Sequence, residues 1–84
     1  MSERWLRCLV LKGMFSDELA IRYPASRQGE GFSVFVPKDK VQGALDEVGK
    51  VQVRFFHDKG TAWAVLPSDT QAIIPVKEED LVAL

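Results

Sequence analysis

The chain has 84 residues, 46% of them hydrophobic, and a formal net charge of −1 from 11 basic and 12 acidic side chains. This length predicts one domain over residues 1–84, and the hydrophobic content argues against disorder. The balanced charge excludes a general attraction to phosphate backbones or anionic lipid, so nucleic-acid binding would need a local basic patch.

The first half of the chain predicts three strands, over 5–12, 19–23 and 32–36, each with side chains alternating between two faces. Pro24 ends the second strand, and the glycine-containing segment 25–31 predicts a hairpin tip. The first strand is apolar on both faces, which predicts a central position or a strand covered by a loop or partner. Symmetric pairing could hide one face, so we expect a monomer or a weak homodimer.

The segment after the third strand, Pro37 to Leu45, predicts a helical turn rather than a full helix. Proline is tolerated at a first helical position, and Val41 and Leu45 share a face at a spacing of four. Gly43 limits any extension of the helix. This junction therefore joins two extended segments through a short turn.

The strongest local signal lies between Lys50 and Leu66, where two β-rich runs flank Asp58-Lys59-Gly60. These three residues predict a hairpin loop, because the final glycine adopts a left-handed conformation without steric penalty. The register that follows places Phe55 opposite Trp63 as the centre of the core. A register shifted by one would set Phe55 against Ala64, and we reject it because it mixes large apolar residues with polar ones.

The end of the chain predicts a short strand over 72–76, at an edge because it contains Pro75, and then a turn or short helix over 77–84. Residues 36–41 resemble residues 74–81: each segment joins an extended residue, a proline, a charged turn and an apolar anchor. Two similar halves, or simply two barrel-closing turns, would give this pattern. Both interpretations predict a barrel of five or six strands.

This layout of short strands, a glycine-turn hairpin and a strand–turn–strand junction at Pro37 resembles the small SH3-like barrels. The resemblance implies a mostly β fold with short helical turns. The chain has neither the acidic loop and aromatic set that dock proline-rich peptides nor the glycine signature of ribosomal KOW barrels. The resemblance therefore implies only that a barrel of this kind binds peptides, proteins or RNA.

Side chains suited to catalysis are few and scattered. His57 is the only histidine and lies beside Asp58 at the predicted hairpin tip, where a polar loop pair is expected. Cys8, the only cysteine, lies among apolar residues and excludes an internal disulfide; it fits a reducing, cytoplasmic compartment. The segment Gly29-Glu30-Gly31 lacks the lysine and helix of a phosphate loop. We expect no enzyme activity, metal or cofactor, and no segment approaches a membrane span.

Apolar residues outside the predicted core mark a candidate binding surface. The third strand points Phe32, Val34 and Val36 inward and Phe35 outward, and Phe56 lies outside if Phe55 lies inside. Each exposed residue could instead have a structural role, such as covering a bent strand or closing a barrel end. The candidate surface contains Met14, Phe15, Phe35, Arg54 and Phe56.

Two functions are compatible with these observations. The first is a small, non-enzymatic cytoplasmic barrel that acts as a protein-interaction or accessory module, through this surface or through the edge strand at 73–76. The alternative is an RNA-binding, translation-associated barrel with a basic and aromatic strip for stacking bases, although the net charge disfavours it. Its candidate RNA-facing residues are Arg22, Tyr23, Arg27 and Lys59.

Overall fold

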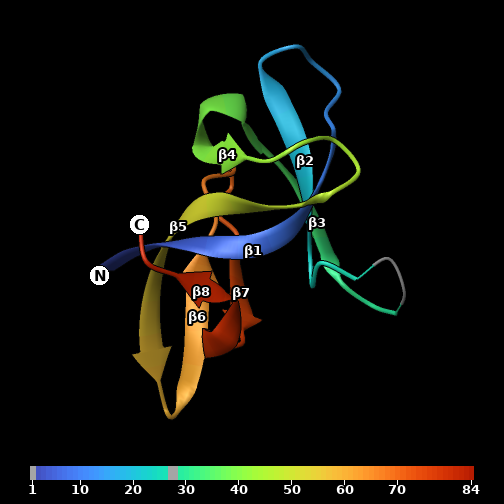
Figure 1. Ribbon diagram of the computed structural model, residues 1–84. Helices are drawn as coiled ribbons and strands as arrows, with labels where there is room; N and C mark the ends of the chain where they lie inside the picture. Colours follow the sequence, from blue (N-terminus) through green and yellow to red (C-terminus); the bar gives the residue numbers. More distant parts are fainter. Residues whose placement is uncertain (1, 27–28) are drawn as a thin grey trace.

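The computed structural model describes residues 2–26 and 29–84. The strands are β1 (Ser2–Lys12), β2 (Glu18–Tyr23), β3 (Phe32–Pro37), β4 (Val41–Gln42), β5 (Val48–Asp58), β6 (Thr61–Val65), β7 (Ile73–Val76) and β8 (Leu81–Val82), and the 3₁₀ turns η1 (Lys38–Lys40) and η2 (Glu78–Asp80) precede β4 and β8. Six antiparallel strands form a nearly closed barrel in the order β3-β2-β1-β5-β6-β7 (Figure 1). The predicted mostly β class and small barrel are confirmed, and the arrangement is compatible with the SH3-like layout.

The two halves of the chain follow the same path. In each half, three antiparallel strands lead into a 3₁₀ turn and a two-residue strand. That short strand pairs with the first strand of the other half: Val41 of β4 lies opposite Val51 of β5, and Leu81 of β8 lies opposite Leu6 of β1. Leu6 and Val51 also lie opposite each other. The pairing therefore has approximate two-fold symmetry centred on this residue pair, and Figure 1 shows the β1–β2 and β5–β6 turns at opposite ends.

The repeat noticed in the sequence corresponds to this symmetry, with a different alignment. Pro37 and Lys77 are the residues that immediately precede η1 and η2, so Pro37 corresponds to Lys77 and not to Pro75. The helical turn predicted over 37–45 is limited to the three residues of η1, because Val41 and Gln42 leave the turn to pair with β5. Each copy of the sequence repeat thus consists of a strand, a single 3₁₀ turn and the two-residue strand that follows it: β3, η1 and β4 in the first half, and β7, η2 and β8 in the second.

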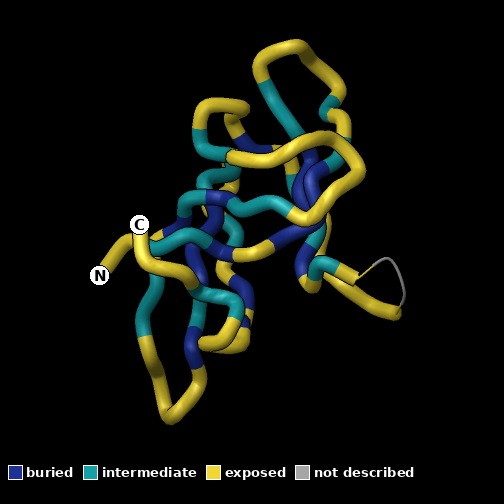
Figure 2. The backbone as a smooth tube through the Cα atoms, in the orientation of Figure 1, coloured by how far each residue is buried: buried dark blue, intermediate teal, exposed yellow. Residues whose placement is uncertain are grey.

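The hydrophobic core lies where the central strands cross, shown in dark blue in Figure 2, and the hairpin tips are exposed. β1 contacts β2, β5 and β8, which confirms its predicted central position. Its inward side chains, together with those of β2, β3, β5, β6 and β7 and with Leu66 just after β6, form one cluster that includes Leu6, Cys8, Val10, Ile21, Val36, Val51, Val53 and Ile74. Cys8 is 0% exposed, and burial raises the pKa of its thiol from 9.0 to about 12.

The predicted register of the β5–β6 hairpin is wrong by one residue. Phe55 lies opposite Ala64, and Trp63 lies opposite Phe56 on the other face of the sheet. The loop contains two residues, Lys59 and Gly60, with φ values of 52° and 80°, so Asp58 remains in the strand. Two successive residues in the left-handed region suit the twist of a two-residue hairpin turn. The expected Phe55–Trp63 core pair therefore does not form.

Candidate functional site

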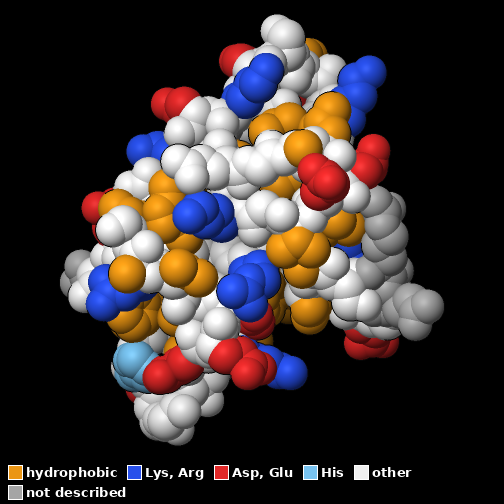
Figure 3. Space-filling model, in the orientation of Figure 1, with side chains coloured by type: hydrophobic (Ala, Val, Ile, Leu, Met, Phe, Trp, Pro, Cys, Tyr) orange, Lys and Arg blue, Asp and Glu red, His pale blue; other side chains and the backbone are white. Residues whose placement is uncertain are grey.

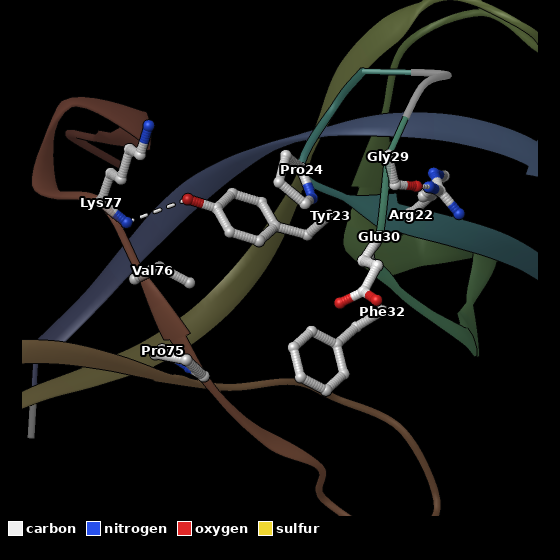
Figure 4. A pocket seen from close by; sticks show the side chains of 10 residues that line it. Arg22, Tyr23, Pro24, Gly29, Glu30, Phe32, Pro75, Val76 and Lys77 are labelled. Atoms are coloured by element: carbon white, nitrogen blue, oxygen red, sulfur yellow. Dashed lines mark hydrogen bonds between the residues drawn. The ribbon is translucent and has the colours of Figure 1, made fainter.

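Two open clefts lie beside β3 and β7, the strands at the two ends of the barrel order. The first, which we call the Tyr23 cleft, has a volume of about 830 Å³ and contains Arg22, Tyr23, Glu30, Phe32, Pro75 and Lys77 (Figure 4). The second, which we call the Phe15 groove, has a volume of about 970 Å³ and contains Phe15, Asp17, Val34, Phe35, Pro37 and Asp69.

The two clefts are related by the approximate two-fold symmetry of the chain. Residues 35–37 of β3 line the Phe15 groove, and residues 75–77 line the Tyr23 cleft. Each residue of the first set stands 40 positions before its counterpart, as Val41 of β4 does before Leu81 of β8. The fold thus offers the same kind of cleft twice, with different side chains in each.

The Phe15 groove brings together two of the predicted surface residues from distant parts of the sequence. Phe15 comes from the β1–β2 turn and is 69% exposed, and Phe35 comes from β3 and is 46% exposed. Met14, the neighbour of Phe15 in the chain, is 74% exposed. The predicted outward positions of these three side chains agree with their exposure, and the structure adds that two of them share a groove.

The turn that carries Met14 and Phe15 is held by hydrogen bonds. The Glu18 N–H donates to the Phe15 carbonyl at 3.3 Å, and the Met14 N–H donates to the Glu18 carboxylate at 3.2 Å. The Lys38 N–H donates to the Asp17 carbonyl at 3.0 Å, which ties the turn to η1. An ordered turn therefore presents two large apolar side chains to solvent.

The remaining predicted surface residues lie elsewhere. Arg54 lines a smaller pocket of about 370 Å³ that adjoins the Phe15 groove at Ser68. Phe56 is half-buried, because it packs beside Trp63 on the outer face of the β5–β6 hairpin. β7, predicted as an edge, ends the strand order.

Among the candidate RNA-facing residues that the structure describes, Arg22, Tyr23 and Lys59 do not form one accessible strip. The guanidinium of Arg22 donates to the carbonyls of Ser26 at 3.1 Å and Gly29 at 2.6 Å. Tyr23 is 4% exposed, so its ring is not accessible for stacking. Lys59 lies at the tip of the β5–β6 hairpin, and Arg27 lies outside the described residues. Figure 3 shows basic and acidic side chains interspersed on the face in view.

The Tyr23 hydroxyl joins the second-half turn to the barrel. It donates to the Asp80 carboxylate at 2.6 Å and accepts the Lys77 N–H at 2.9 Å, the bond drawn in Figure 4. Burial and the bond to Asp80 raise the pKa of Tyr23 from 10.0 to about 12. Asp80 also lies 3.9 Å from the Arg7 guanidinium. These contacts hold η2 against the end of β2.

Replacing Tyr23 with phenylalanine should lower the free energy of unfolding by about 1–2 kcal/mol, because the Lys77 N–H loses its acceptor while the ring volume is kept. Urea unfolding of Tyr23→Phe, Asp80→Ala and the double variant would measure this. A double variant whose loss is smaller than the sum of the two single losses is expected. Strictly additive losses would contradict the coupling between the two side chains.

Sequence reasoning missed part of both clefts. Phe32 was expected to point inward, but it is 49% exposed at the start of β3, where it lines the Tyr23 cleft. Phe32 lies on the core-facing side of β3, opposite Tyr23, as the alternation predicts, but the strand begins at the rim of the barrel, beyond the core. Asp17 and Asp69 were not singled out, because they are 52 positions apart in the chain (69 − 17) and only the fold brings them to one groove.

His57 and Cys8, the two side chains considered above for catalysis, line neither cleft. His57 contacts the carboxylate of Glu78 in η2 rather than Asp58, and both side chains are at least half exposed. Within residues 2–26 and 29–84, no group of three or more histidine, cysteine or acidic side chains could hold a metal ion. The helical segments in this part of the chain are too short to cross a membrane.

Comparison with protein-family models, with curated proteins and with solved structures gives no match to this chain.

Proposed function

We propose that this protein is a non-enzymatic protein-interaction module that binds a partner polypeptide in the Phe15 groove. The observation that carries the proposal is that two exposed phenylalanine side chains, one from the β1–β2 turn and one from β3, line a single groove. Single exposed apolar residues are common on protein surfaces, but two large rings in one concave site are typical of a binding site.

The energy available from these rings suits a moderate-affinity interaction. Burying a phenylalanine side chain contributes roughly 1.5–3 kcal/mol, and Phe15 and Phe35 retain 69% and 46% of their exposure. Covering both rings would therefore supply about 2–3 kcal/mol, the range of an interface hot spot. The hydrogen-bonded turn limits the ordering cost on the side of this protein, because Phe15 is already presented.

Binding rather than catalysis is also supported by the environments of the only cysteine and the only histidine in the sequence. The Cys8 thiol is buried with its pKa raised to about 12, so it carries no thiolate at neutral pH. The imidazole of His57 is exposed and contacts the carboxylate of Glu78. A cytoplasmic location is proposed on the ground of the single cysteine, which suits a reducing compartment.

The test is affinity capture from the source organism with the tagged wild type, the Phe15→Ala/Phe35→Ala variant and Phe32→Ala, each with and without RNase. Phe32 is the matched control, because it lies on the same strand as Phe35 with similar exposure, 49% against 46%, but in the other cleft. A partner that survives RNase should be retained by the wild type and by Phe32→Ala, and the double variant should bind it at least about tenfold more weakly.

The same experiment can contradict the proposal. Partners captured equally by all three proteins would show that the Phe15 groove is not the binding site. Partners lost on RNase treatment would favour the RNA-binding alternative, for which the burial of Tyr23 and the hydrogen bonds of Arg22 give little support. The three alanine substitutions remove side chains that are 46–69% exposed, so thermal unfolding should confirm that each variant remains folded under the binding conditions.

A further inference from the structure

The Phe15 groove is acidic. Asp17 and Glu18 enter it from the β1–β2 turn and the start of β2, and Asp69 enters it from the loop between β6 and β7. None of the lining residues of this groove is lysine, arginine or histidine. Because the whole chain has a net charge of only −1, the negative charge is a local property of this groove.

Two of the three carboxylates are available to a ligand. Glu18 accepts the Met14 N–H and so belongs to the framework of the turn. Asp17 and Asp69 are exposed, and neither side chain makes a hydrogen bond or ion pair within residues 2–26 and 29–84. The groove thus combines two exposed aromatic rings with two unpaired carboxylates.

We infer that the Phe15 groove binds an extended, arginine-containing segment of a partner protein. This inference rests on the proposed function and names the chemistry of the partner. Arginine matches both features of the groove, since its planar guanidinium stacks on an aromatic ring while its N–H groups donate to a carboxylate. The rings of Phe15 and Phe35 supply the stacking surface, and Asp17 and Asp69 supply the acceptors. The same carboxylates repel nucleic-acid phosphates.

The charges beyond the groove give the bound segment a direction. The smaller pocket that adjoins the groove at Ser68 contains two basic residues, Lys40 and Arg54, and one acidic residue, Glu3, so basic charge is in excess there. An arginine bound toward Phe15 and Asp17 avoids these like charges, whereas an arginine near Lys40 would meet them. The matching segment therefore has its basic residue within the groove, between Asp17 and Asp69, and an apolar residue where it continues past Ser68.

The test is selection of random peptides displayed on phage against the immobilised full chain, after removal of clones that also bind Phe15→Ala/Phe35→Ala. The surviving clones should be enriched in arginine next to a leucine or aromatic residue. Synthetic peptides from these clones are then measured against Asp17→Asn/Asp69→Asn. The matched control is Asp39→Asn/Asp58→Asn, which removes the same charge from exposed positions outside the groove.

The peptides should bind Asp17→Asn/Asp69→Asn about tenfold more weakly than wild type, and high salt should weaken their binding to wild type by a similar factor. Their affinity for the control variant should equal that for wild type. Clones that need the two rings but lack arginine, or that bind Asp17→Asn/Asp69→Asn equally well, would overturn this inference and leave the proposed function standing. Clones that resemble a segment of this chain would point to a second copy as the occupant and would also overturn it. If no clone distinguishes wild type from the double alanine variant, both the inference and the proposed function fail.

Discussion

Replacing Gly49 with alanine should lower the free energy of unfolding by about 3 kcal/mol, one of the largest losses expected from a single added methyl group in this protein. A Cβ at this position would lie 2.3 Å from the Gln42 carbonyl oxygen and 2.8 Å from a Val10 methyl group. The Gln42 oxygen belongs to β4, which pairs with β5 beside Gly49. Relief of the clash therefore requires movement of the strand that closes the first half of the barrel.

Urea unfolding of Gly49→Ala and Gly60→Ala would separate crowding from backbone conformation. Gly60 has φ of +80° and nothing within 4 Å of a Cβ, so alanine there should cost only about 1 kcal/mol, from the left-handed conformation. The backbone of Gly49 is not in the left-handed region, so the loss of stability in Gly49→Ala comes from steric contact of the added methyl group alone. A loss for Gly49→Ala no larger than that for Gly60→Ala would contradict the close approach of β4 to β5.

Stability should also fall steeply in alkali. Burial raises the pKa of Cys8 from 9.0 to about 12, so above pH 9 the unfolded chain releases a proton that the folded chain retains. The stability due to the neutral thiol is complete below pH 9 and is lost as pH rises toward about 12, at about 1.4 kcal/mol per pH unit and about 4 kcal/mol in all. Tyr23, whose pKa rises from 10.0 to about 12, adds to the loss above pH 10.

The contribution of Cys8 can be isolated with Cys8→Ala. This variant starts from a lower stability, because a fully buried side chain is shortened, but its stability should fall less steeply between pH 9 and 12. Urea unfolding at a series of pH values, with reductant present, measures both slopes. Tyr23 and the other ionisable groups are common to both proteins, so the difference between the slopes reports Cys8. Parallel slopes would show that the thiol ionises as freely in the folded state as in the unfolded state.

The strands were predictable because their signals are local. Period-two patterns and the stops at Pro24 and at the 58–60 turn locate all six barrel strands to within a few residues. The register of the β5–β6 hairpin was not predictable in this way, because Phe55 and Phe56 make both faces of β5 apolar. Both phenylalanine side chains are half-buried in the structure. Keeping large apolar residues on one face was the wrong criterion: the inside of this small barrel places a small residue, Ala64, opposite Phe55, and Trp63 pairs with Phe56 on the outer face.

The candidate site shows the same division between local and distant information. The exposure of Phe15 and Phe35 followed from their places in a turn and on the outer face of a strand. Their meeting in one groove, with Asp69 from the other half of the chain, depends on how β3 and the β6–β7 loop approach each other. Alternation of side chains carries no information on that approach. The pairing of β4 and β8 with strands of the opposite half was unpredictable for the same reason, since each strand has only two residues.

The exchange of closing strands means that the halves are interlocked rather than merely similar. If the chain were cut between Gln42 and Val48, the first piece would contain β1 without its partner β8, and the second piece would contain β5 without its partner β4. During synthesis, residues 2–42 would emerge with β1 still uncovered on the side where β8 binds. The native barrel would therefore assemble only when the last strand, Leu81–Val82, has left the ribosome, and it should unfold in a single cooperative transition.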